Sequence, residues 1–553
     1  MLCIQHSLQP LSASLLQHRK YTPIVVSYFA MLFMKTGLTL FFVILVLQAQ
    51  AVRLFIPMDA TQTNHLRAYG VVFNAIGSGT RAEWLLNYKG GSFVMDYTSA
   101  LDISCTAAGV SFSRMTDKDY NALIKRIKFT NFNGDVIPLT KAPKIAVYTP
   151  SNKKPWDDAV TLALTYAGIP FDKVYVDEVM AGALSKYDWL HLHHEDFTGQ
   201  YGKFWATYKD VPWYREDCRV AERLAARHGF RKVSQMQLAM VKKIRDFVAG
   251  GGNLFAMCSA TDTYDIALAA AGTDICDTPF DGDGIDPAAQ AKLNFGNCFA
   301  FTGFTVSANK YEYEYATIDN TPMRFLPEST DKFTLLPFPA KFDHVPAMLT
   351  QNHTRSINGF MGQTTAFRKE ALKPGVVVLA DRKDIHEARY IHGSYKAGSW
   401  TFFGGHDPED YQHMVGESPT DLAKHPNSPG YRLILNNVLC LASGKKDIPA
   451  VTFGQEAVPA AKADIPQQRS ASGDIRIAAG NNANSLVISF AGPSEKAGVV
   501  RKIKSVAFLN AAGREVYARV YDAATVTVDM ENLPAGMYNI KVNGEYAGKV
   551  VKN

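Results

Sequence analysis

The stretch SQMQLAMVKKIRDFVAGGGNLFAMCSATDTYD, residues 234–265, decides the expected fold. Its first half predicts a helix from Ser234 to Val248, because apolar residues recur at helical spacing behind a serine that can cap the N-terminus. Glycines 250–252 end that helix. The segment NLFAMC (253–258) then predicts a buried strand, followed by a second helix that Asp262 caps. Helix, glycine turn, strand and helix in this order are typical of a sheet that is covered by helices.

The same alternation extends from Pro143 to Gly444. Strands are expected at KIAVYT, DKVYVDEV, YDWLHLHH, GVVVLAD and GSWTFFGG, which are residues 144–149, 172–179, 187–194, 375–381 and 398–405. Helices are expected at 156–168 and 430–444. The predicted fold class is therefore α/β, with a mostly parallel sheet and helices on both faces. In such sheets the functional site lies at the carboxyl ends of the strands.

The two ends of the chain differ from this centre. Residues 1–51 predict an export signal. From Met34, the sequence MKTGLTLFFVILVLQAQA has one lysine, an apolar run and a small-x-small cleavage site. Met34 is therefore the expected true start of translation. The alternative is an uncleaved anchor, but the run is shorter than the ~20 residues of a membrane span, and no stable span is expected after cleavage. Residues 52–445 are expected to form the α/β domain with an N-terminal extension. Residues 446–473 predict a linker rich in Ala, Pro and Gln, and 474–553 predict a small all-β sandwich.

Composition excludes several classes of function. The chain has 553 residues, of which 47% are hydrophobic and 20% charged, as in folded proteins. Its net charge of +6 comes partly from the signal region, and no lysine/arginine cluster alternates with aromatic residues, so no nucleic-acid partner is expected. The seven cysteines contain no CxxC pair, which argues against a zinc knuckle. The acidic turn DGDGIDP (281–287) departs from a calcium loop, which needs glycine at its sixth and glutamate at its twelfth position.

A first cluster of chemically capable residues lies in WLHLHHEDFTGQYGKF, residues 189–204. On a strand, His191 and His193 point to one side and His194 to the other. The candidate cleft and substrate-binding residues are His193, His194, Glu195, Asp196 and Gly199, together with Gly405 of a later strand end. Histidines with carboxylates are also metal ligands, so His193 and Glu195 are metal candidates, with His406 as a third ligand, although no cofactor is expected. The plain alternative is a polar strand end satisfied by its neighbours.

Two further strand ends supply a candidate catalytic pair. Cys258 ends a buried strand before a helix, where a nucleophile is placed at a sharp turn; the alternative is an inert core cysteine. His406 follows Gly405 in GSWTFFGGHDPEDYQH and is a candidate general base, with Glu409 or Asp407 as its orienting acid. The alternative is a turn in which the acids favour a helix N-terminus.

The order of these stretches resembles the class I glutamine amidotransferase-like fold. The resemblance implies an oxyanion loop at 197–202, Cys258 as nucleophile, His406 as base, and Glu409 or Asp407 as acid. The family's Gly-x-Cys-x-Gly is here Ala256-Met257-Cys258-Ser259-Ala260, and its His-Pro-Glu has become His-Asp-Pro-Glu at 406–409. Within that fold, GSWTFFGGHDPEDY and YRLILNNVLCLASG resemble the trehalose-utilisation (ThuA-like) family over residues 143–444. That family generally lacks a catalytic cysteine and is linked to sugar metabolism.

The whole chain, with PMDATQTNHLRAYG and EWLLNYKGGSF, also resembles an exported Bacteroidetes family often labelled asparagine synthetase B. A synthetase of that type needs an N-terminal cysteine and an SGGxDS pyrophosphate loop, and the sequence has neither. LPAGMYNIKVNGEYAGKVVKN resembles the C-terminal sorting domain of type IX secretion. This implies a bacterial protein exported to the cell surface or the extracellular space, with the type IX secretion machinery as a partner.

The sequence therefore predicts an exported amidotransferase-like hydrolase that acts on an amide or carbohydrate-derived substrate through a Cys–His–acid site. The alternative is a non-catalytic module of the ThuA-like type that binds a glycan or another small molecule.

Overall fold

The computed structural model describes residues 52–129, 131–150, 158–320, 326–413, 417–446, 450–453, 468–469, 475–479, 485–490, 502–510, 515–534 and 536–552. The predicted signal region and most of the predicted linker lie outside these residues.

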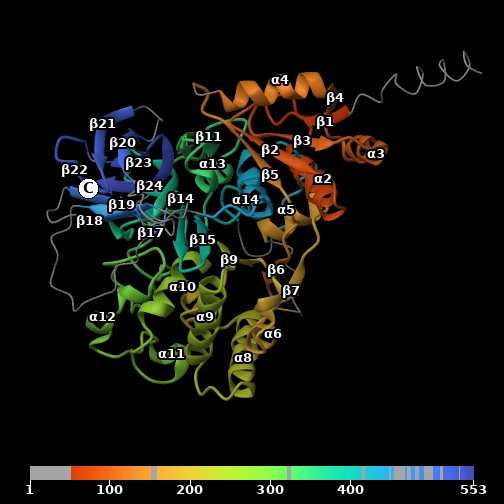
Figure 1. Ribbon diagram of the computed structural model, residues 1–553. Coiled ribbons are helices and arrows are strands. Elements are labelled where there is room, and N and C mark those ends of the chain that lie inside the picture. Colours follow the sequence, from red (N-terminus) through yellow and green to blue (C-terminus); the bar gives the residue numbers. More distant parts are fainter. Residues whose placement is uncertain are drawn as a thin grey trace, which may run out of the picture. The chain divides into compact units, whose positions relative to one another are not determined.

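The first sheet among the described residues has five strands in the order β4-β1-β3-β2-β5. Its strands are β1 (Val52–Ile56), β2 (Ala82–Leu86), β3 (Ser92–Asp96), β4 (Ser113–Thr116) and β5 (Asp135–Leu139). The β1–β3, β2–β3 and β2–β5 pairs are antiparallel. Helices α2 (His65–Gly77), α3 (Ser99–Ala108) and α4 (Asp117–Lys128) belong to the same region (Figure 1).

A ten-stranded sheet forms the centre, in the order β11-β10-β13-β14-β15-β9-β8-β6-β7, with β12 paired to β14. Its strands are β6 (Ile145–Tyr148), β7 (Asp172–Val174), β8 (Trp189–Leu192), β9 (Asn253–Met257), β10 (Lys332–Leu335), β11 (Ser356–Asn358), β12 (Phe367–Arg368), β13 (Val377–Arg382), β14 (Glu387–Tyr395) and β15 (Gly398–Phe403).

The helices that accompany this sheet are α5 (Ala159–Ala167), α6 (Val176–Met180), α7 (Trp205–Tyr208), α8 (Pro212–Arg227), α9 (Val233–Ala249), α10 (Ala260–Ala269), α11 (Thr278–Asp281), α12 (Ala289–Lys292), α13 (His344–Leu349) and α14 (Pro429–Cys440). Short 3-10 helices are η1 (Ala183–Lys186), η2 (Tyr201–Lys203), η3 (Phe295–Asn297), η5 (Glu328–Thr330), η6 (Lys369–Ala371) and η7 (Leu441–Ser443).

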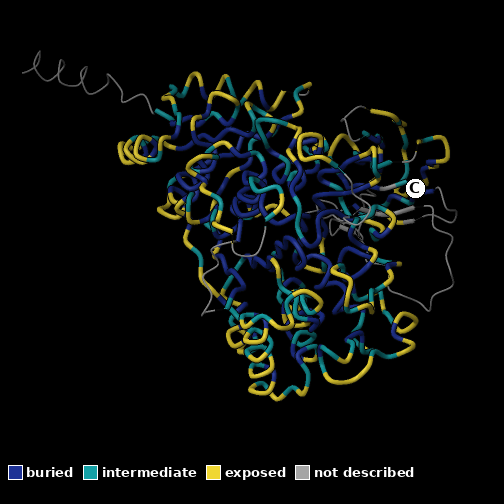
Figure 2. Tube along the Cα trace, turned by 180° about the vertical axis from the view of Figure 1, so that it is seen from behind, coloured by how far each residue is buried: buried dark blue, intermediate teal, exposed yellow. Residues whose placement is uncertain are grey.

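Alternate residues of the central strands face two different cores. In β6, Val147 packs in a core that includes buried residues of α2, α5 and α14, whereas Ala146 packs with α9 and α10. Figure 1 shows α9 and α10 next to each other beside β9, and Figure 2 shows the buried trace running through the interior. Helices thus cover both faces of this sheet, and apolar burial at about 25 cal/mol per Å² holds the layers together.

The predicted mostly parallel α/β sheet of the amidotransferase type is wrong. Pairs β7–β6, β6–β8, β8–β9 and β9–β15 are parallel. Pairs β15–β14, β14–β13, β13–β10, β10–β11 and β12–β14 are antiparallel. The separate sheet that precedes them also contains antiparallel pairs, β1–β3, β2–β3 and β2–β5. The physical reason is the short turns at 383–386 and 396–397, because a parallel connection needs a crossover of a dozen or more residues.

Individual elements also differ from expectation. The strand predicted at 172–179 ends at Val174, and Val176 begins helix α6. Helix α9 begins at Val233, so the predicted cap Ser234 lies inside the helix. Helix α10 begins at Ala260, and Asp262 lies in its first turn rather than at the cap.

The C-terminal region contains two further sheets, β16-β24-β23-β20-β21 and β17-β18-β19-β22. Their strands are β16 (Ala450–Phe453), β17 (Gln468–Arg469), β18 (Ile475–Ala479), β19 (Ser485–Phe490), β20 (Ile503–Asn510), β21 (Glu515–Ala523), β22 (Thr525–Asp529), β23 (Gly536–Val542) and β24 (Glu545–Lys552). Buried residues of both sheets form one apolar core, which includes Ile488 and Phe508. None of the helices among the described residues combines the length and apolar character needed to cross a membrane.

Candidate functional site

The four adjacent parallel strands β15, β9, β8 and β6 bring the predicted site segments to one edge of the central sheet. His193 directly follows β8, Cys258 directly follows β9, and His406 follows β15 after two glycines. Because the carboxyl ends of parallel strands lie at the same edge, segments that are 65 to 213 residues apart in sequence converge there.

Asp158 is the buried anion of this edge. It caps α5, where its Oδ1 accepts hydrogen bonds from the backbone N–H groups of Val160 and Thr161 at 2.8 and 3.1 Å. The same oxygen lies 3.2 Å from Nε2 of His191 and 3.4 Å from Nδ1 of His193. Burial alone would raise the pKa of Asp158, but the two histidines outweigh it and hold that pKa well below the ordinary value.

The ring of His193 lies between Asp158 and His406, the histidine that follows β15. Its Nε2 lies 3.0 Å from Nδ1 of His406, and the two rings are nearly perpendicular with centroids 4.4 Å apart. One nitrogen from each of His193, His194 and His406 lies within 4.8 Å of the others. We call these three residues the histidine centre. Two of its members are buried and His194 is exposed, so the centre has a solvent side.

Burial and neighbouring imidazoles lower the pKa of two histidines at this edge, His406 and His191. Burial lowers the pKa of His406 well below its usual value, and His193, His194 and His413 lower it further. Burial likewise lowers the pKa of His191, although Asp158 opposes that shift. His406 and His191 are therefore neutral near pH 7, and each of these two rings keeps one nitrogen lone pair.

The acidic residues after His194 bind backbone N–H groups. Glu195 accepts the backbone N–H of His193 at 2.7 Å, and burial raises its pKa to about 8. Asp196 accepts the backbone N–H groups of Thr198 and Gly202 at 2.7 and 2.9 Å, and burial raises its pKa. The carboxylate of Asp196 thus organises the loop that was expected to donate to an oxyanion.

Cys258 adopts a left-handed backbone conformation with φ 49°, the strained turn expected of a nucleophile between a strand and a helix. Its N–H donates to the carbonyl of Gly405 at 3.2 Å. Burial raises the pKa of the thiol to about 11, although backbone N–H groups of Thr364, Gln363 and Ser259 act in the opposite direction. The thiol is only 3% exposed, and the largest influences on its pKa include no imidazole.

Two predicted glycines shape the backbone around the site. Gly405 has φ 100°, and a Cβ there would lie 2.4 Å from the ring of Phe360. Gly199 has φ 86°, and a Cβ there would lie 2.7 Å from the backbone of Ser234 in α9. Both positions therefore require glycine, the first beside His406 and the second against a helix.

The two acids expected to orient His406 have other partners. Glu409 Oε2 lies 3.0 Å from Nδ1 of His425. Asp407 accepts a hydrogen bond from the hydroxyl of Tyr431 at 2.8 Å. The carboxylate connected to His406 is Asp158, through His193.

Sequence reasoning missed two members of this region. Asp158 was read only as part of a helix, although an aspartate that caps a helix after a strand is also placed at the sheet edge. His413 lies in the stretch that contains His406, and its ring stacks on that of His406 with centroids 4.8 Å apart. Its Nδ1 lies 2.9 Å from Asp410, so the sequence spacing Asp-x-x-His was the available signal.

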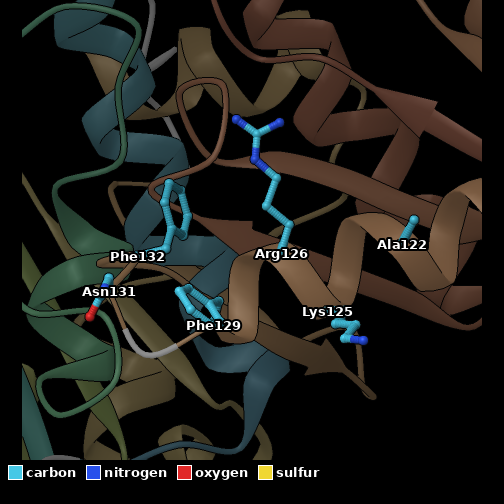
Figure 3. Close-up of a pocket in the computed structure, with 6 residues that line it drawn as sticks. All are labelled: Ala122, Lys125, Arg126, Phe129, Asn131 and Phe132. Carbon is cyan, nitrogen blue, oxygen red and sulfur yellow. The ribbon is translucent and has the colours of Figure 1, made fainter.

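A hollow elsewhere on the surface has no comparable chemistry. It is lined by Ala122, Lys125, Arg126, Phe129, Asn131 and Phe132 (Figure 3). These residues belong to helix α4 and the segment after it, and none of them is part of the histidine centre.

Comparison with known proteins identifies the C-terminal region. Residues 482–553 match the model of the secretion system C-terminal sorting domain. The chain therefore carries a type IX sorting domain, which directs it to the cell surface or the extracellular space. This confirms the predicted export and the predicted secretion machinery as partner.

No curated protein matches the chain. Similar solved structures include a DUF3244 family protein with an immunoglobulin-like β-sandwich fold from Bacteroides vulgatus. The two sequences are 20% identical, the match covers 14% of this chain and 76% of that chain, and the TM-score is 0.11. A cytoplasmic protein from Salmonella typhimurium has 9% identity, covers 54% of this chain and 97% of its own, and gives a TM-score of 0.26. A β-galactosidase from Bacillus circulans is 10% identical, with 70% of this chain and 40% of that chain covered and a TM-score of 0.23. Similarity at TM-scores this low establishes neither a shared fold nor a shared activity.

Proposed function

We propose that the protein is an exported hydrolase that acts on an amide or carbohydrate-derived substrate, with the histidine centre as its reaction centre. The observation that carries the proposal is the convergence of His193, His194 and His406 at the carboxyl edge of parallel strands. Asp158 lies behind His193 and fixes the direction of its ring, which is the arrangement by which carboxylates orient catalytic imidazoles.

In this proposal the centre activates the water that attacks the substrate. His194 is exposed and gives the substrate access, while His193 and His406 are buried and held by Asp158 and by backbone contacts. A buried, preorganised polar group interacts more strongly with developing charge than the same group in water.

Cys258 is the alternative nucleophile in the same proposal. Its left-handed backbone and the three backbone N–H groups near its sulfur support that role. Its raised thiol pKa and its burial oppose it, because the thiolate is the reactive form. Iodoacetamide labelling at neutral pH separates the two: a nucleophilic Cys258 reacts faster than Cys440 and slows in His406→Ala. Equal and slow labelling of both cysteines excludes the thiol mechanism.

The hydrolase proposal is tested with a panel of p-nitroanilides and p-nitrophenyl glycosides. Wild type is expected to release nitroaniline or nitrophenol from at least one member, and His406→Ala is expected to lower that rate at least 100-fold. The matched control is His425→Ala, which removes a partly exposed histidine that pairs with Glu409. No turnover by wild type, or equal rates in wild type and His406→Ala, contradicts the proposal.

A second candidate function is binding of a glycan without catalysis, and an aromatic surface favours it. The ring centroids of Trp205 in α7 and of Tyr311 are 5.8 Å apart. Nζ of Lys209 lies 4.5 Å from the centroid of the Trp205 ring. Tyr311 is 68% exposed and Tyr313 is 46% exposed. Exposed aromatic rings beside lysines offer flat apolar faces and hydrogen-bond donors, which suit a sugar ring.

Affinity electrophoresis in gels that contain starch, pectin, chondroitin sulfate or mucin tests this second candidate. At least one polysaccharide is expected to retard wild type, and the double variant Trp205→Ala/Tyr311→Ala is expected to migrate freely. The control is Phe129→Ala, which removes an aromatic ring of similar exposure on α4's C-terminal cap. Unretarded wild type in all four gels contradicts glycan binding.

A further inference from the structure

The geometry of the histidine centre is close to that of a set of metal ligands. His193 Nε2 and His406 Nδ1 are 3.0 Å apart. One ring nitrogen of each of His193, His194 and His406 lies within 4.8 Å of the other two. Two nitrogens bound to one tetrahedral zinc ion, each at about 2.0–2.1 Å, lie about 3.3 Å apart. A three-nitrogen zinc site therefore requires that the first two rings separate by a few tenths of an ångström and that the exposed His194 ring moves toward them.

The nitrogen of His406 that faces His193 is Nδ1, so an ion held between these two rings would bind that atom. Nε2, the other ring nitrogen, is fully buried and has no hydrogen-bond partner within the described part of the chain, and this arrangement leaves it as it is. The site therefore rests on the spacing of the ligand nitrogens and on the surroundings of His193.

The surroundings of His193 resemble the outer sphere of a zinc site. Asp158 Oδ1 lies 3.4 Å from its Nδ1, on the far side of the ring from His406. In metal centres a carboxylate commonly accepts the second N–H of a histidine ligand, which directs the other nitrogen's lone pair at the ion. His191 contacts the same carboxylate at 3.2 Å and fixes its position.

We propose that His193, His194 and His406 bind one zinc ion, with Asp158 as the positioning residue for His193. Three imidazoles suit zinc among the common divalent metals, and a site with three protein ligands keeps a fourth position for water. His194 places that fourth position on the solvent side. Zinc binding itself stands on the geometry, whereas a role of the ion in activating water rests on the proposed hydrolase function.

The test is zinc titration of the purified full chain after treatment with dipicolinate. Isothermal titration calorimetry with ZnCl₂ is expected to give one equivalent of bound zinc, and His406→Ala and His194→Ala are each expected to weaken binding at least 100-fold. His194 is exposed, so its replacement keeps the test valid if His406→Ala does not fold. Asp158→Asn is expected to weaken binding about 10–100-fold, the range for outer-sphere partners.

Two controls separate this site from other histidines. His425→Ala is expected to bind zinc as wild type does. His413→Ala tests the neighbouring group Asp410, His413 and Glu417, whose ligand atoms also lie within 4.8 Å of one another. Binding that is lost in His413→Ala and retained in His194→Ala would move the ion to that group and overturn the proposal.

Substitution with Co²⁺ provides a spectroscopic measurement. A tetrahedral cobalt site is expected to give visible d–d absorption that disappears in His194→Ala. Absence of stoichiometric zinc binding below 10 µM, or unchanged binding in both centre variants, overturns the inference. If the protein binds zinc but turns over no chromogenic substrate, only the proposed hydrolase function is contradicted. If turnover persists after dipicolinate treatment and the protein binds no zinc, only the metal site is contradicted.

Discussion

Two clusters of potential metal ligands in this protein differ in the charged side chains that surround them. In the first, the histidine centre, three imidazoles lie close together, and the buried carboxylate of Asp158 lies beside one of them, His193. In the second, Asp274, Cys276 and Asp281 come together in the loops around α11. We call this second group the acidic loop cluster.

The acidic loop cluster already contains a cation from the protein itself. Nζ of Lys232 lies 2.6 Å from Asp274 and 3.1 Å from Asp281, and it also pairs with Asp283. These carboxylates raise the pKa of Lys232 above its ordinary value, although burial acts against them. The ammonium group of Lys232 thus pairs with two acids of the turn at 281–287, Asp281 and Asp283, whereas three imidazoles lie together in the histidine centre. Residue types that can bind metal therefore do not by themselves show whether a cluster is already neutralised by the protein's own side chains.

The largest expected effect belongs to Asp158→Ala. Removing this buried carboxylate leaves His191, His193 and two backbone N–H groups without their acceptor, so we expect the free energy of unfolding to fall by about 3–5 kcal/mol. Urea denaturation at pH 7 measures the change. Asp177→Ala, which removes an exposed ion-pair partner, is the control with an expected change below about 1 kcal/mol. Similar losses in both variants would contradict the central place of Asp158.

Gly405→Ala is expected to have the next largest effect. The new Cβ would meet the Phe360 ring at 2.4 Å, in a left-handed conformation that disfavours alanine. Gly109→Ala also places alanine at a positive φ, 65°, at a cost of about 1–2 kcal/mol, with nothing within 4 Å of the new Cβ. We expect Gly405→Ala to be less stable than Gly109→Ala by about 1–3 kcal/mol, the usual cost of overpacking. Equal melting temperatures of the two variants would show that the backbone beside His406 tolerates displacement.

Lys232→Met tests the acidic loop cluster directly. Loss of the ammonium group leaves adjacent carboxylates without compensation, so we expect a loss of about 1–3 kcal/mol at pH 7. Burial raises the pKa of Asp281, so this carboxylate is protonated first as the pH falls and the repulsion weakens. The difference between variant and wild type is therefore expected to shrink at pH 4 in chemical denaturation. A difference that is independent of pH would contradict this electrostatic account.

The smallest expected effect is that of Glu409→Gln. Its carboxylate pairs with the partly exposed His425, so we expect a change in unfolding free energy below about 1 kcal/mol. Asp407→Ala is expected to cost more, about 1–3 kcal/mol, because buried Tyr431 loses the acceptor for its hydroxyl. Differential scanning fluorimetry compares the two. A larger loss from Glu409→Gln would reveal a contact of Glu409 beyond His425.

Local sequence patterns predicted many elements but not the direction of the sheet. The strands expected around Trp189, Leu254 and Trp400 are present as β8, β9 and β15. Strand β14 was missed, and with it the antiparallel succession β13–β14–β15. In this sheet the antiparallel strand β14 is almost as fully buried as the parallel strand β8, so the burial pattern does not show the direction of pairing. Only the length of each connection distinguishes them, and a missed strand makes a short connection look like a long one.

The sequence by itself determined the export signal in the C-terminal domain, several strand ends, and the presence of histidines at two of them. Tertiary structure alone decided which of these side chains meet. His193 and His406 are 213 residues apart and come within 3.0 Å only because β8, β9 and β15 are neighbours in the sheet. Asp158, rather than Glu409 or Asp407, lies behind this pair because α5 begins at the same edge. Sequence spacing describes distances along one element, whereas contacts between elements depend on strand order, which no local pattern contains.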